Sequence, residues 1–189
     1  MHKRKNWLSA LGLLAFLYAG QGLAAESADL TVEARVMDDI LSITAEDNMN
    51  FGSFVFTSFT ASEIILDTQG ERTRSGATAT ELIFLGASQA GRMSVEAFGN
   101  STLSISAPTT ITLDNQDDAG TMTLKNIVFR VDGGADQNND GNAEVPLGPA
   151  PGGGDFTAEI DVFIGGTLDI TTAPPAGRYE GTLAITVDY

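Results

Sequence analysis

The residues best suited to hold a metal ion lie between Asp136 and Leu147. Asp136, Asn138 and Asp140 place oxygen side chains at alternate positions, and Gly141 follows them. This spacing matches the start of a calcium loop, in which oxygens surround a hard cation and glycine permits a sharp turn. The twelfth position normally holds a bidentate glutamate, but here it is Leu147. We therefore favour an Asn/Asp/Gly-rich surface turn and predict no cofactor, with calcium as the alternative.

Catalysis would have to come from carboxylates. The pairs Asp117–Asp118 and Asp38–Asp39 have the residue types for acid/base chemistry, but with 25 acidic residues chance pairs are inevitable. Beyond residue 25 the sequence contains no His, Cys or Trp. Without imidazole or thiolate groups there is no Ser-His-Asp or Cys-His nucleophile and no zinc site of the usual kind. We predict that the chain is not an enzyme and has no catalytic residues.

The first 25 residues have the layout of a signal peptide. A basic stretch, Met1–Lys5, precedes an apolar run from Trp7 to Ala19, and small residues close the segment at Gly22–Ala25. The apolar run is too short to span a bilayer comfortably. We expect residues 1–25 to be removed and the chain to be exported to the periplasm, cell surface or extracellular space, without stable membrane insertion.

The charge of the remaining chain is strongly negative. Three of the ten basic residues lie in the first 25, so 7 basic and 25 acidic residues remain, a net charge of −18. Because this charge repels phosphate backbones, we predict that the chain does not bind nucleic acid.

Short strand patterns separated by turn residues run through residues 37–189. Alternating or β-branched runs predict strands at 40–44, 51–56, 63–67, 80–85, 92–98, 103–106, 109–113, 121–131, 158–164, 167–170 and 179–189. Such a series indicates one all-β domain, an antiparallel sandwich or barrel.

Residues 121–131 and 132–155 allow more specific predictions. In Thr121–Val131 both alternating sets are partly apolar, which predicts a central strand with both faces occupied. The range 132–155 is rich in Gly, Asn and Pro, and we interpret it as one long surface loop that contributes little to the core.

Residues 26–36 form an alternating segment at the new terminus. Five apolar side chains lie on one side of an extended strand: Ala28, Leu30, Val32, Ala34 and Val36. Such a segment can add to an open sheet in another molecule, where main-chain hydrogen bonds supply affinity and side-chain pockets supply specificity. The alternative is that it forms the first strand of its own domain.

The C-terminal stretch from Tyr179 alternates up to the last residue. Leu183, Ile185, Val187 and Tyr189 share one face. This strand is either an internal member of a sheet or an exposed edge, and an exposed edge is an aggregation hazard unless something covers it.

With these two terminal segments and the motifs given below, the chain resembles the DUF4402 family of exported bacterial proteins and, more distantly, spore coat protein U and the subunits of chaperone–usher pili. The shared features are the N-terminal alternating segment, a middle pair of strands around Gly86 and Met93, and a terminal strand closing on an aromatic residue. The matching motifs are Met49-Asn50-Phe51-Gly52, Gly120-Thr121-Met122-Thr123-Leu124, Ile164-Gly165-Gly166-Thr167-Leu168 and Ala176-Gly177-Arg178-Tyr179-Glu180-Gly181-Thr182.

The resemblance implies an immunoglobulin-like β-sandwich that lacks its last strand. A periplasmic chaperone, and then the N-terminal extension of the next subunit, would supply that strand after delivery to an usher. Ala28, Leu30, Val32, Ala34 and Val36 would then be the donor face. The strand from Tyr179 to Tyr189 would border the acceptor site.

Two functions from different classes follow. The favoured one is a non-enzymatic structural subunit of a surface fibre, pilus or coat that associates with itself by strand complementation. The alternative is a monomeric periplasmic or secreted binding domain that takes calcium or a carbohydrate.

Overall fold

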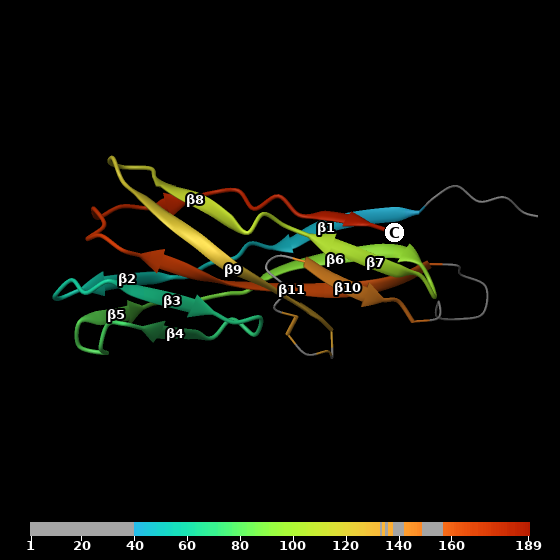
Figure 1. Cartoon of the computed structure of the whole chain (residues 1–189), viewed down its shortest axis with the longest axis horizontal. Helices are drawn as coiled ribbons and strands as arrows, with labels where there is room; N and C mark the ends of the chain where they lie inside the picture. The colour runs from blue at the N-terminus through green and yellow to red at the C-terminus, as the bar shows by residue number, and fades with distance from the viewer. Residues whose placement is uncertain (1–39, 133, 135, 138–141, 149–156) are drawn as a thin grey trace, which may run out of the picture. The chain divides into compact units, whose positions relative to one another are not determined.

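The computed structural model describes residues 40–132, 134, 136–137, 142–148 and 157–189 (Figure 1). These residues form thirteen β-strands and no helix, so none of them builds a helix able to cross a membrane. The strands are β1 (Leu41–Asp47), β2 (Ser53–Phe56), β3 (Ser62–Leu66), β4 (Arg72–Ser75), β5 (Leu82–Leu85), β6 (Gly91–Phe98), β7 (Thr102–Ser106), β8 (Thr110–Asn115), β9 (Thr121–Val131), β10 (Asn142–Pro146), β11 (Thr157–Ile170), β12 (Tyr179–Glu180) and β13 (Thr186–Asp188).

The largest sheet is antiparallel and has β11 at its centre. Its main order is β1-β6-β11-β9-β8-β12, and β3 and β4 extend it beside the second half of β11. Along one edge, β11 pairs first with β6, from Thr157 to Ile164, and then with β3, from Gly166 to Ile170. Along its other edge it pairs with β9. The predicted strands 158–164 and 167–170 are therefore one strand.

Two smaller sheets complete a sandwich-like arrangement. The three-stranded sheet β10-β7-β13 packs with β6, β9 and β11 around a cluster that includes Phe129, Ile105 and Val162. The pair β2-β5 contributes Leu82 and Phe84 to a second cluster, with Ile64 of β3 and Ile170 of β11. This all-β antiparallel architecture confirms the predicted fold class. Its core consists mainly of alternate apolar side chains removed from water.

The prediction that β9 has two occupied faces is wrong, and a bulge explains the misleading pattern. Met122 and Leu124 are buried in the first half of the strand, but Ile127 and Phe129 are buried in the second half. Asn126 lies between them with φ of 50°, and the register with β11 shifts there. An inserted residue changes which alternating set faces the core, so one face stays buried along the whole strand.

The range 132–155 is not one long loop, because β10 lies inside it. Asn142–Pro146 pairs with β7, and Ala143 and Val145 point into the first core cluster together with Leu147. The expectation that this range contributes little to the core is therefore wrong. Its Gly, Asn and Pro content obscured a three-member apolar alternation.

The C-terminal strand is also less continuous than predicted. Tyr179–Glu180 pairs with β8 and Thr186–Asp188 pairs with β7, while residues 181–185 belong to no strand. The alternation nevertheless holds, since Leu183 and Ile185 are half-buried against the first cluster and Val187 is buried.

Candidate functional site

The feature best suited to bind another chain is the free edge of the C-terminal segment, residues 179–189, which we call the C-terminal edge. It pairs on one side with β7 and β8, and within the described part of the chain its other side carries no strand. Thr182, Ala184 and Thr186 are exposed and alternate with the apolar side chains that pack on the core. The stretch Gly181–Val187 has no charged residue. The free side of this stretch therefore has backbone N–H and C=O groups available for pairing, and its apolar side chains pack on the core beneath them.

Several other strand edges are protected, and β4 with β5 gives the clearest case. Arg74 donates to the carbonyl of Leu82 at 2.6 Å, and Arg72 donates to the carbonyl of Gly86 at 2.8 Å and to that of Phe51. Both guanidinium groups lie over the ring of Phe84, at 4.5 Å for Arg72 and 4.3 Å for Arg74. Burial, together with the charge of Arg74, lowers the pKa of Arg72. Charged side chains that bind neighbouring carbonyls prevent a further strand from adding here.

The edges of β1 and β10 carry protection of other kinds. β1 has a register shift between Ala45 and Asp47 and ends in two acidic residues that pair with Arg92. β10 is short and ends at Pro146. Bulges, charges, short length and proline all hinder edge-to-edge pairing. Gly181–Val187 differs from these strands because it has neither a charged residue nor a proline.

Removing the Arg74 contacts tests whether this side chain stabilises the domain. We expect Arg74→Met to lower the free energy of unfolding by about 1–3 kcal/mol, because a half-buried carbonyl loses a charged donor and Phe84 loses its cation. Urea titration followed by circular dichroism measures the change. Arg178→Met is the matched control, since Arg178 is 77% exposed and pairs with Glu180 at the surface, and it should change little. Equal effects of the two substitutions would contradict a structural role for Arg74.

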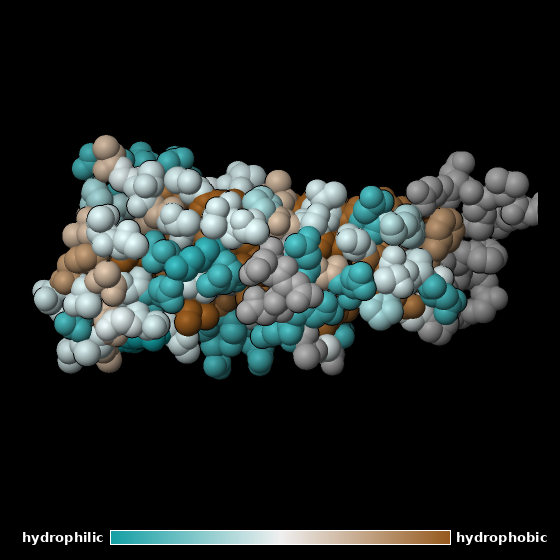
Figure 2. Space-filling model, in the orientation of Figure 1, coloured by the Kyte–Doolittle hydropathy of each residue, from teal (hydrophilic) through white to brown (hydrophobic). Residues whose placement is uncertain are grey.

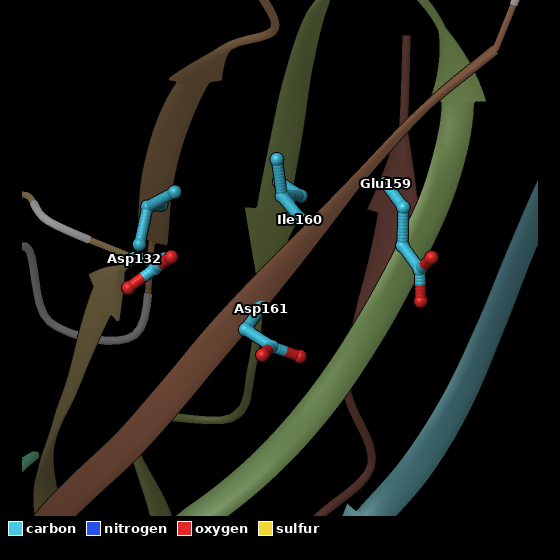
Figure 3. Close-up of a pocket in the computed structure, with 5 residues that line it drawn as sticks. Asp132, Glu159, Ile160 and Asp161 are labelled. Atoms are coloured by element: carbon cyan, nitrogen blue, oxygen red, sulfur yellow. The ribbon is translucent and has the colours of Figure 1, made fainter. Parts of the chain in front are cut away.

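One depression of the described surface brings three carboxylates near one another. It is lined by Val131, Asp132, Glu159, Ile160 and Asp161. Figure 3 shows the three carboxylates spread apart and not aimed at a common point. Two are already engaged: Ser94 donates to Glu159 at 2.7 Å, and Arg92 pairs with Asp161 at 3.3 Å. Over the described residues no group of three or more possible metal ligands occurs.

The candidate calcium residues are described only in part. Asn138 and Asp140 lie outside the described residues. Asp136 accepts a hydrogen bond from the Thr68 hydroxyl at 2.5 Å and lies 3.9 Å from the Arg130 guanidinium. Arg130 also donates to the same hydroxyl and stacks on Phe163. Asp136 thus holds its segment against β9 and the β3–β4 turn.

Two cations join neighbouring strands of the large sheet. Lys125 of β9 reaches Glu63 of β3 at 2.8 Å and Asp169 of β11 at 2.9 Å. Hydrogen bonding to Glu63, and then to Asp169, raises the pKa of Lys125. Arg92 links β1 and β11 in the same way, and its bond to Asp47 raises its pKa. Both cations are therefore already paired with carboxylates.

The face shown in Figure 2 is mostly hydrophilic, with hydrophobic side chains in scattered patches.

The predicted donor face, from Ala28 to Val36, lies outside the described residues, as does the predicted signal peptide. Of the predicted C-terminal residues, Leu183, Ile185 and Val187 share the core-facing side, whereas Tyr179 lies at the opposite end from Tyr189. The sequence did not point to Arg72 and Arg74, because Arg-Thr-Arg-Ser has no apolar alternation.

Comparison with known proteins gives one family. Residues 41–189 match the family described as "Domain of unknown function (DUF4402)". Neither the curated proteins nor the solved structures contain a match to this chain. The more distant likeness to spore coat protein U and pilus subunits stays a prediction. Since the match covers well over half of the sequence, the chain belongs to the DUF4402 family.

Proposed function

We propose that this chain is a non-enzymatic, exported structural subunit of a surface fibre, pilus or coat. Copies join by strand complementation: residues 26–36 of one copy add to the C-terminal edge of the next. The observation that carries the proposal is the contrast between edges. Gly181–Val187 has no charge and no proline, and its Leu183 and Ile185 are half-buried, whereas β1, β4, β5 and β10 carry charges, a register shift or a proline.

The donor segment has the chemistry that this edge requires. Its five apolar side chains alternate with polar ones, so one face packs on an apolar base while the other stays in water. Its eleven residues span at most about 40 Å when extended, more than enough to run beside residues 181–187 of a neighbour. The next described residue after the segment is Ile40, directly before β1.

The test is Val32→Asp in the mature chain. If Val32 is buried in a neighbour, its loss removes about 1.5–3 kcal/mol of burial and adds the cost of desolvating a carboxylate. We expect association between copies to weaken at least about 100-fold, because each 1.4 kcal/mol is a factor of ten. Size-exclusion chromatography with light scattering measures the association, and urea titration measures the stability of the isolated subunit.

Thr31→Asp is the matched control, because it places the same charge one residue away on the polar face. It should leave association nearly unchanged. A wild-type chain that stays monomeric at high concentration, and whose own stability falls in Val32→Asp, would contradict the proposal. That result would instead indicate that residues 26–36 complete their own domain, as in the monomeric binding domain.

A further inference from the structure

The C-terminal edge is closed at one end by Tyr189. The Tyr189 hydroxyl donates to the carbonyl of Ile40 at 2.5 Å and accepts a hydrogen bond from the Phe98 amide at 3.3 Å. The rings of Tyr189 and Phe98 lie 6.4 Å apart. Ile40 precedes β1 and Phe98 ends β6, both in the large sheet, whereas Tyr189 follows β13 in the small one. The phenol therefore crosses from one sheet of the sandwich to the other.

The rest of the edge does not determine where an added strand stops. The apolar side chains of residues 26–36 recur every second residue, and so do Leu183, Ile185 and Val187. A slip of one residue turns the apolar face outward and is excluded, but a slip of two residues keeps every apolar side chain on the same side. Alternation alone therefore permits several registers, whereas a regular assembly needs one.

We propose that Tyr189 sets the register of the donated strand, as a positioning residue that stops it at one end of the edge. This inference rests on the proposed strand donation. The phenol ties the end of β13 to the start of β1 through its bond to Ile40, and in the proposed assembly a strand added beside residues 181–188 meets it at that end. The donor stops there, and its apolar side chains are aligned with Leu183 and Ile185 in a single way.

The chain contains no cysteine, so paired single-cysteine variants report the register without background. One mature chain carries Ala184→Cys on the exposed face of the edge. Its partner chain carries Asp29→Cys, Thr31→Cys, Glu33→Cys or Arg35→Cys, one at a time, on the polar face of the donor. After mixing and mild oxidation, the yield of intermolecular disulfide is measured on non-reducing gels. A disulfide requires Cβ atoms about 4 Å apart, and a two-residue slip moves them by about 6.6 Å.

With Tyr189 present, we expect one donor position to give at least about ten times the disulfide yield of the others. In the Tyr189→Ala background, that preference should fall below about threefold, as positions two residues apart become similar. Tyr189→Phe keeps the ring but loses both hydrogen bonds, and it should show an intermediate preference. This milder variant keeps the result decisive if Tyr189→Ala does not fold.

Tyr179→Phe is the matched control, because the Tyr179 hydroxyl donates to the carbonyl of Pro175 at 2.8 Å at the other end of the edge. It should leave the preference unchanged. An unchanged preference in both Tyr189 variants would overturn the register assignment while leaving strand donation intact. Disulfide yields no higher than for freely colliding chains at all four positions, with Tyr189 present, would contradict strand donation itself.

Discussion

Val145→Asp is expected to destabilise the domain severely. Val145 of β10 is 1% exposed and pairs with Leu103 of β7, which is fully buried. A carboxylate there loses its hydration and gains no counter-ion, which costs about 3–5 kcal/mol. Since small domains are stable by about 5–15 kcal/mol, this is a large share of the total. Urea titration followed by circular dichroism measures the loss.

Glu144→Asp is the control for this change, because it places an aspartate on the adjacent, exposed face of the same strand. Its unfolding midpoint should match that of the wild type. If Val145→Asp also left the midpoint unchanged, β10 would not belong to the core, and the whole range 132–155 would behave as a surface loop.

Gly165→Ala is expected to destabilise the domain by about 2–4 kcal/mol, because the site has no room for a methyl group. A Cβ atom at this position would lie 2.5 Å from the carbonyl oxygen of Leu66 and 2.9 Å from the carbonyl carbon of Asp67. Both are backbone atoms, so relief requires β11 to move away from the end of β3. Thermal unfolding followed by calorimetry measures the change.

Gly148→Ala serves as the comparison, since nothing lies within 4 Å of a Cβ built there. It should leave stability within about 0.5 kcal/mol of the wild type, as surface substitutions usually do. A Gly165→Ala variant as stable as Gly148→Ala would mean that the contact between β11 and the β3–β4 turn is looser than described.

Much of the sheet architecture follows from period-two patterns in the sequence. β6 and β9 begin and end close to their predicted limits because their apolar side chains alternate and turn residues flank them. The buried face of β9 was not predictable, because the bulge at Asn126 depends on pairing with β11 and leaves both alternating sets looking apolar. β4 escaped prediction for the opposite reason: its Arg72 and Arg74 are stabilised by carbonyls and a ring from distant segments.

The sequence predicted the apolar alternation of the C-terminal edge, but not that this segment lies at the edge of its sheet. Of the four residues predicted to share one strand face, Leu183 and Ile185 are half-buried and Val187 is buried, whereas Tyr189 is 45% exposed. Whether the strand was internal or at an edge depended on which strands lie beside it, which alternation does not encode. The hydrogen bond from Tyr189 to Ile40 joins residues 149 positions apart, so no local sequence pattern predicts it.

The central place of β11 has a consequence for the order of events during synthesis. β11 is the only described strand that pairs with β3, β6 and β9 together, and it supplies Val162 and Ile164 to one core cluster and Leu168 and Ile170 to the other. Its residues are made after all three partners. Until residues 157–170 emerge, the growing chain carries three strands whose main partner does not yet exist. Pairing over long sequence separations is slow, and it leaves unpaired strand edges and apolar side chains exposed. We therefore expect the incomplete chain to be prone to aggregation until β11 is made. We therefore expect both core clusters to close only after β11 has been made.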